Sequence, residues 1–256
     1  MLSRAVVRPP GANFAAGLTS LRLGAPVYTR ALKQHEAYCA ALERCGLNLV
    51  RLQADEGYPD STFVEDVAVI TEHGAILTRP GAPSRTGEVD LVRGALAQFY
   101  STLGSIRDPG TLDGGDICEV GNHFFVGISA RTNQTGGDQL AAFLASLGYT
   151  SSFVDIRRVK GILHLKSGLA HLGDNRLVVI DALSNRMEFE GYDLIVVNQQ
   201  EEYAANCVRV NQRILVAVGY PELEKRISEF GYRTIALEIT EFQKMDGGLS
   251  CLSLRF

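Results

Sequence analysis

The feature that most constrains the fold of this chain is a β-hairpin pattern that recurs four times. Each copy places two short runs of β-branched and other apolar residues on either side of a tight polar turn, as two antiparallel strands do. The four hairpins cover residues 67–77, 117–126, 169–180 and 207–216. This recurrence predicts one supersecondary unit that is used several times.

A helical segment and then another short strand are expected after each hairpin. The helical segments lie near residues 86–100, 133–147, 182–190 and 221–230, and the strands include 192–197 and 234–239. A fifth unit is divided between the two ends of the chain. Its expected parts are a strand at 4–8, a helix at 28–45, a strand at 48–52 and a last strand in 251–256.

Five ββαβ units whose ends pair would close into a ring, which removes exposed sheet edges and leaves a site on the central axis. Periodicity alone leaves open an alternative, an open α/β sheet with irregular hairpins. No linker-like or low-complexity stretch separates two halves of the chain. We therefore predict an α/β protein in which residues 1–256 form a single domain.

Charge and cysteine content exclude several classes of function. The 25 Lys and Arg residues against 29 Asp and Glu leave a net charge of −4, without the basic excess of a nucleic-acid binder. No apolar run approaches the about 20 residues that span a bilayer, so no membrane insertion is expected. Five scattered cysteines favour a reducing, cytoplasmic environment. Neither a CxxC pair nor an HExxH motif occurs, so no metal site is predicted.

Cys251 is the candidate nucleophile, and His164 is its candidate partner. Cys251 follows Gly247 and Gly248, which allow a sharp turn that presents a thiol at the start of a strand. Taken alone, such a cysteine is more often a small buried hydrophobe. His164 interrupts the apolar, strand-like run 161–168. It is either an acid/base group or a core residue whose ring bonds to the backbone.

Acidic residues gather in two segments, 60–66 and 111–116. Carboxylates among glycines and apolar residues suit a pocket for a planar cation, because a guanidinium offers its donors in a fixed fork. The alternative is that they are solvated turn residues. Arg85 and Arg131, in two adjacent units, could clamp a carboxylate or could lie on the surface.

Five motifs together resemble the dimethylarginine dimethylaminohydrolase family, in the family's order and over essentially the whole chain. They are Phe63-Val64-Glu65-Asp66, Leu112-Asp113-Gly114-Gly115-Asp116, Leu163-His164-Leu165-Lys166-Ser167, Ala204-Ala205-Asn206-Cys207 and Met245-Asp246-Gly247-Gly248-Leu249-Ser250-Cys251. The resemblance implies the pentein fold, a five-bladed α/β propeller with pseudo-fivefold symmetry. That fold agrees with the five repeated units.

The resemblance also assigns the site residues. Cys251 corresponds to the nucleophile, His164 to the acid/base residue and Asp113 to the carboxylate that completes the catalytic set. Some members carry Glu in place of Asp113, which leaves open whether the shorter side chain reaches His164, the substrate or both. The implied substrate-binding residues are Leu18 in a mobile lid loop, Asp60, Glu65, Asp66, Arg85, Arg131, Met245 and Asp246.

The implied reaction converts asymmetric dimethylarginine or monomethylarginine into citrulline and dimethylamine or methylamine, through a thiouronium intermediate on Cys251. No cofactor is required, and zinc at the Cys251 thiolate would act only as an inhibitor. The resemblance also suggests a homodimer. Two alternatives stay open at this point: an arginine-type deiminase on the same fold, and a non-catalytic pentein that binds or assembles other molecules.

Overall fold

The protein contains five small sheets of three strands each, in a computed structural model that describes residues 1–256. In each sheet two strands pair antiparallel, and the middle strand pairs in parallel with a third. The strand orders are β3-β4-β5, β6-β7-β8, β9-β10-β11, β12-β13-β14 and β15-β1-β2. The predicted α/β class and the repeated three-stranded unit are confirmed.

The strands are β1 (Arg4–Val7), β2 (Asn48–Arg51), β3 (Ala68–Ile70), β4 (Ala75–Leu77), β5 (Leu103–Ser105), β6 (Ile117–Val120), β7 (His123–Ile128), β8 (Thr150–Asp155), β9 (Leu169–Gly173), β10 (Arg176–Ile180), β11 (Asp193–Val197), β12 (Val208–Val210), β13 (Arg213–Ala217), β14 (Arg233–Leu237) and β15 (Leu254–Arg255). The α-helices are α1 (Tyr28–Arg44), α2 (Val89–Leu96), α3 (Gln134–Ser146), α4 (Pro221–Glu229) and α5 (Thr240–Gln243).

Turn residues at the hairpins have the backbone conformation that tight turns require. Asp174 and Asn175 between β9 and β10 have φ of 51° and 61°, and Asn211 between β12 and β13 has φ of 55°. Asn and Asp tolerate this left-handed region better than other non-glycine residues. The sequence pattern therefore located the hairpins through their turns as well as through their apolar strands.

One expected helix is wrong. The segment 182–190 forms two short 3₁₀ turns, Asp181–Leu183 and Met187–Phe189, instead of an α-helix. Leu183 and Phe189 are buried and anchor one turn each. Between them, the Ser184 hydroxyl donates to the carbonyl of Asp181, a local bond of the kind that competes with helical hydrogen bonding.

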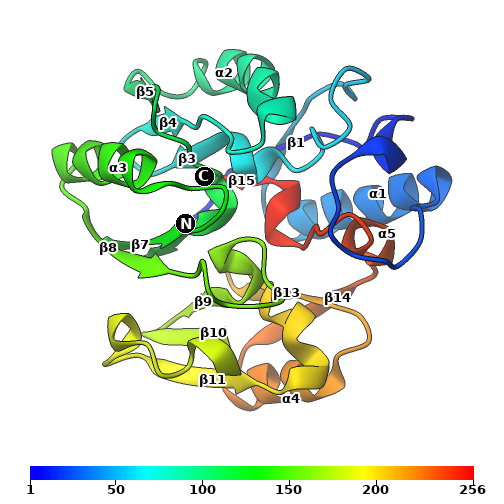
Figure 1. Ribbon diagram of the computed structural model, residues 1–256. Helices are drawn as coiled ribbons and strands as arrows, with labels where there is room; N and C mark the ends of the chain where they lie inside the picture. Colours follow the sequence, from blue (N-terminus) through cyan, green and yellow to red (C-terminus); the bar gives the residue numbers. More distant parts are fainter.

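Figure 1 shows the five sheets following one another around the molecule in sequence order, with α1 to α4 on the outside and both chain ends near the middle. The inner strands make contacts between sheets, namely β15 with β3, β6 with β9, and β9 with β12. The apolar core is divided into four clusters. The middle of the molecule is thus lined by one strand from each sheet.

The split fifth unit is confirmed by the pairing of the chain ends. Ala5 lies opposite Arg255 and Val6 opposite Leu254 in the antiparallel β1–β15 pair. Strand β1 also pairs in parallel with β2. The last residues therefore complete a sheet that the first residues begin, and this sheet follows directly on the turn that carries Cys251.

None of the helices combines the length and the apolar character needed to cross a membrane.

Candidate active site

One small pocket brings together nine of the predicted site residues. These are Leu18, Asp60, Asp66, Arg85, Arg131, His164, Met245, Asp246 and Cys251. The cavity volume is about 20 Å³, which is room for about one water molecule. The pocket is therefore closed over its own side chains, and a larger molecule could enter only if part of the wall moved.

Asp113 lies behind His164, outside the pocket lining. Its Oδ2 is 3.0 Å from Nε2 of His164, and its Oδ1 accepts a hydrogen bond of 2.8 Å from the Gly81 N–H. The carboxylate is fully buried. The shorter side chain of Asp at this position therefore reaches the imidazole.

The environment of His164 favours the charged imidazole. Nδ1 lies 4.0 Å from Oδ1 of Asp66. Burial by itself lowers the pKa of His164, but the carboxylates of Asp66, Asp113 and Asp116 outweigh it and raise the pKa to about 9. His164 is thus an imidazolium at neutral pH and can donate a proton.

Asp66, Asp113 and His164 also place three potential metal-ligand atoms within 4.8 Å of one another. The atoms already have protein partners. Asp66 accepts from the Gly115 N–H at 2.9 Å and from Arg85 at 2.6 Å, and Asp113 is bonded to His164. We interpret the cluster as a charged histidine between two carboxylates.

His164 is not in a strand, contrary to the expectation for 161–168. It precedes the 3₁₀ turn Leu165–Ser167, and its carbonyl accepts from the Ser167 N–H at 3.0 Å. Gly115 packs against the ring, where a Cβ would lie 2.7 Å from Nδ1 of His164 and 2.8 Å from Oδ1 of Asp66. The glycine thus permits the close approach of the histidine and the carboxylate.

Cys251 lies in the 3₁₀ turn Ser250–Leu252, just before β15, and is 9% exposed. Its Sγ accepts from the Gly248 N–H at 3.4 Å. Burial raises the pKa of the thiol to about 12, with further contributions from the carboxylates of Glu65 and Asp66. The cysteine is therefore a neutral thiol at neutral pH, although it shares the pocket with a charged imidazole.

The two predicted arginines differ in how much of their hydrogen-bonding capacity is free. Arg85 is buried and donates to Asp66 at 2.6 Å and to both oxygens of Glu88 at 2.8 to 3.1 Å. It also donates to the carbonyls of Asp60 and Phe63. Arg131 is 3.8 Å from Asp113 and its side chain is 18% exposed. Arg131 is thus the cation with more donors available for a bound anion.

A loop that carries Leu18 closes the mouth of the pocket. The Leu18 N–H donates to both oxygens of Asp60, at 3.0 and 3.2 Å, and the Ser20 N–H donates to Asp246 at 2.6 Å. The Thr19 hydroxyl donates to the carbonyl of Lys244 at 2.9 Å. The two carboxylates therefore hold this loop over the pocket.

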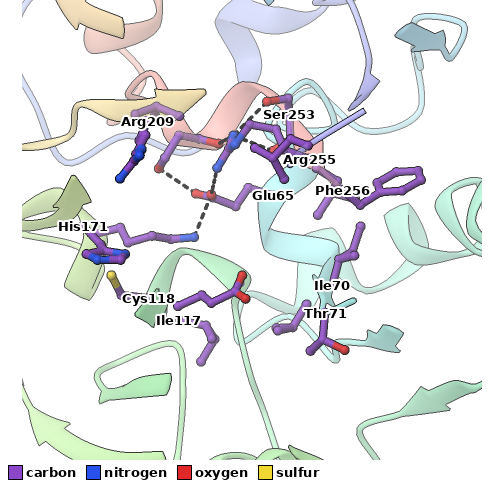
Figure 2. A pocket seen from close by; sticks show the side chains of 18 of the residues that line it. Glu65, Ile70, Thr71, Ile117, Cys118, His171, Arg209, Ser253, Arg255 and Phe256 are labelled. Atoms are coloured by element: carbon purple, nitrogen blue, oxygen red, sulfur yellow. Dashed lines mark hydrogen bonds and ion pairs between the residues drawn. The ribbon is translucent and has the colours of Figure 1, made fainter. Parts of the chain in front are cut away.

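Glu65 differs from the other predicted site residues because its side chain points away from the pocket. Its carboxylate accepts from the Ser250 hydroxyl at 2.7 Å and pairs with Lys166 at 2.6 Å and Arg255 at 3.3 Å. These groups line a second, larger cavity in the middle of the molecule (Figure 2). The side-chain contacts expected of Glu65 in the substrate pocket are absent.

Sequence reasoning gave no role to Asn206, which the structure places between the two catalytic segments. Its Oδ1 accepts from the Ser250 N–H at 2.8 Å, and its Nδ2 donates to the Lys166 carbonyl at 2.9 Å. The only signal in the sequence was an amide at the start of an apolar strand, within one of the five motifs.

Comparison with known families agrees with this geometry. The model of the arginine deiminase family matches residues 56–194, which is more than half of the chain. The fold and the site together define a hydrolase of the arginine deiminase class.

Individual relatives narrow the class. An N(G),N(G)-dimethylarginine dimethylaminohydrolase from Pseudomonas aeruginosa is 43% identical over the full length of both chains. A crystal structure of the Pseudomonas aeruginosa enzyme, a cysteine variant with citrulline, has a TM-score of 0.97 at 42% identity over both whole chains. A histidine variant of a dimethylarginine dimethylaminohydrolase, as an adduct with S-methyl-L-thiocitrulline, also has a TM-score of 0.97 at 42% identity over both whole chains. The chain belongs to the dimethylarginine dimethylaminohydrolase family.

Proposed function

We propose that this protein hydrolyses Nω-methylated arginine, namely asymmetric dimethylarginine and monomethylarginine, to citrulline and the corresponding methylated amine. The observation that carries the proposal is the meeting of a buried thiol, Cys251, and a carboxylate-flanked imidazole, His164, in one acidic pocket. The relatives with this name, one of them in complex with citrulline, support the same reaction.

The substrate cation fits the charge of the pocket. A guanidinium offers planar donors to carboxylates, and Asp66 lies beside His164 to receive them. Arg131, with donors to spare, would bind the α-carboxylate of the amino acid, while Arg85 keeps Asp66 in place. The loop with Leu18 would close over the bound molecule and exclude water.

Substrate binding activates the nucleophile. The Cys251 thiol is neutral in the free pocket because burial and nearby carboxylates disfavour a thiolate. A guanidinium placed against Asp66 adds a positive charge beside the sulfur and lowers the pKa of the thiol. The thiol proton leaves to solvent, so a nucleophile forms only when its target is present.

The first half of the reaction forms a covalent intermediate. The Cys251 thiolate attacks the guanidinium carbon and forms a C–S bond, giving a neutral tetrahedral adduct. The imidazolium of His164 then protonates the methylated nitrogen, and the C–N bond breaks. Dimethylamine or methylamine leaves, and a thiouronium cation stays on Cys251.

The second half returns the enzyme to its starting state. Neutral His164 accepts a proton from water while the oxygen attacks the thiouronium carbon. The C–S bond of the new tetrahedral adduct breaks, and a proton passes from the product to the sulfur. Citrulline leaves with the oxygen of that water, and Asp113 stabilises the imidazolium that has re-formed.

We also propose the finer features that the sequence suggested. The order of the five sheets around the middle supports a five-bladed propeller of the pentein type, and the pairing of β1 with β15 supports one catalytic domain over residues 1–256. The chemistry above uses no cofactor, and zinc would inhibit by binding the Cys251 thiolate. We further propose that the protein is a homodimer and that it is cytoplasmic. The five free cysteines suit a reducing compartment.

Product analysis tests the proposed function. Purified protein is incubated separately with asymmetric dimethylarginine, monomethylarginine and arginine, and citrulline is measured together with dimethylamine, methylamine and ammonia. We expect citrulline and a methylated amine in equal amounts, lost in Cys251→Ala. Citrulline and ammonia from arginine alone would indicate a deiminase, and no product from any of the three would favour the non-catalytic alternative.

A further inference from the structure

Glu65 separates the active-site pocket from a large axial cavity. This axial cavity has a volume of about 760 Å³ and is lined by the inner strands β3, β6, β9, β12 and β15. Glu65 is 4% exposed, and Figure 2 shows its carboxylate as the centre of a group of hydrogen bonds at the cavity wall. One oxygen accepts from the Ser250 hydroxyl at 2.7 Å, and the other pairs with Lys166 at 2.6 Å.

These two contacts reach the two chain segments on which the chemistry depends. Ser250 directly precedes Cys251, and its Oγ lies 4.0 Å from the sulfur. Lys166 is in the 3₁₀ turn Leu165–Ser167 that His164 begins. Glu65 therefore connects, with one bond to each, the turn that carries the thiol and the turn that carries the imidazole.

The charge of Glu65 also acts on the thiol. After burial, the Glu65 carboxylate is the largest cause that raises the pKa of Cys251, while the Lys166 ammonium acts in the opposite direction. Both charges are screened little by solvent because they are largely buried, with side-chain exposures of 5% and 16%. The negative charge of Glu65 and the positive charge of Lys166 therefore act on the pKa of the Cys251 thiol in opposite directions.

We propose that Glu65 is a positioning residue that joins the Cys251 turn to the His164 turn and places a negative charge behind the sulfur. The inference rests on the proposed function, because it assigns the nucleophile to Cys251. It replaces the expected contact of Glu65 with substrate by a role behind the reacting atoms. A negative charge at this place disfavours the thiolate, which is the form of cysteine that reacts with electrophiles.

The test measures the rate of Cys251 alkylation by iodoacetamide against pH in the absence of substrate, with the modified peptide identified by mass spectrometry. Glu65→Gln keeps the size of the side chain and removes its charge. We expect its rate curve to lie about 0.5 to 1 pH unit below that of the wild type. Lys166→Met should shift the curve in the opposite direction. Glu119→Gln is the matched control, since Glu119 lines the same axial cavity without a bond to Ser250.

A second variant separates the charge from the hydrogen bond. Glu65→Asp keeps the charge but withdraws the carboxylate from Ser250, so we expect an unchanged alkylation curve and a kcat reduced at least about tenfold. Thermal unfolding of each variant identifies any that fail to fold. Shifts of Glu65→Gln and Lys166→Met in the same direction, or no shift in either folded variant, would overturn the proposal. Alkylation needs no substrate, so this outcome is distinct from failure of the product assay.

Discussion

At the scale of single residues, the site holds its two reacting groups in opposite states. Cys251 is buried beside carboxylates and stays a thiol, whereas His164 lies between carboxylates and is charged. Nearby carboxylates contribute to both effects, because they add to the burial that disfavours a thiolate and they favour an imidazolium. In the proposed mechanism a cationic substrate changes the electrostatic field at Cys251, which couples binding to activation.

Removal of the Asp113 charge tests how the imidazole is held. In Asp113→Asn the hydrogen bond to Nε2 loses its ionic partner, so the pKa of His164 should fall and kcat should drop by about 10² to 10⁴. The His164 titration can be followed by NMR of a ¹⁵N-labelled ring. Asp90→Asn, an exposed change on α2, should leave both quantities unchanged. An unaltered His164 titration in Asp113→Asn would contradict the hydrogen bond between Asp113 and His164.

The raised pKa of His164 also predicts how stability depends on pH. Its value of about 9 in the folded protein lies above 6.5, the ordinary pKa of histidine. The charged ring therefore contributes fully to stability below about pH 6.5, and this contribution is lost as the pH rises through about 9. The free energy of unfolding in urea, compared at pH 6.5 and 9.5, should decrease more in the wild type than in Asp113→Asn. Equal decreases would argue against a charged His164.

The sequence predicted which residues meet in the site better than it predicted where each side chain points. Cys251 and His164 line one pocket, and Asp113 is bonded to His164. Glu65 and Asp66 are neighbours on one 3₁₀ turn, so their side chains point to different cavities. Residue type and spacing do not specify that direction, which depends on how the turn packs against the last strand.

At the scale of elements, the loop that carries Leu18 lies over the pocket. Two carboxylates, Asp60 and Asp246, accept from its backbone N–H groups. The loop is thus fixed by a few polar bonds over an almost filled cavity. Elements of this kind open more readily than the packed strands around them.

Gly17→Ala should weaken substrate binding through this loop. A Cβ at position 17 would lie 2.5 Å from Oδ1 of Asp60 and 3.2 Å from Cε of Met245, so the loop would have to shift. We expect KM to rise several-fold, about 1 kcal/mol of lost binding, while kcat changes less. Gly94→Ala on α2 meets nothing within 4 Å and is the control. Steady-state kinetics with dimethylarginine measures KM and kcat of both variants. An unchanged KM in Gly17→Ala would show that the loop does not contribute to substrate binding.

Elements with a strong periodic pattern were predicted well, and short irregular ones were not. The four hairpins and helices α1, α3 and α4 occur close to where the pattern placed them. The segment around 182–190 fails because two buried anchors and a local Ser184 bond give 3₁₀ turns. The segment of His164 fails because its apolar residues pack beside a turn, and an apolar run by itself does not distinguish a strand from such a turn.

At the scale of the whole molecule, the pairing of the two chain ends links stability to the site. Strand β15 is only two residues long, yet it pairs with β1 and follows the turn of Cys251. Leu254 is 5% exposed and packs in the core cluster that includes Val6. A change in this short strand therefore acts on both the closure of the fold and the position of the nucleophile.

Leu254→Ala should destabilise the whole protein. The cavity left in the core predicts a loss of about 2 to 5 kcal/mol in the free energy of unfolding. Met187→Ala, at a side chain that is 79% exposed, should change it by no more than about 0.5 kcal/mol. Urea unfolding followed by circular dichroism gives both values. Similar stabilities for the two variants would show that the β1–β15 pairing contributes little.

The most direct test of the account is detection of the covalent intermediate during turnover. The protein is mixed with asymmetric dimethylarginine, quenched in acid within milliseconds to seconds, and digested for mass spectrometry. We predict an adduct on the Cys251 peptide of the wild type with the mass of the substrate less dimethylamine, and little or none in His164→Gln, which lacks the acid that protonates the departing amine. Citrulline formation without an adduct on Cys251 at any time, or an adduct on another residue, would contradict the proposed mechanism.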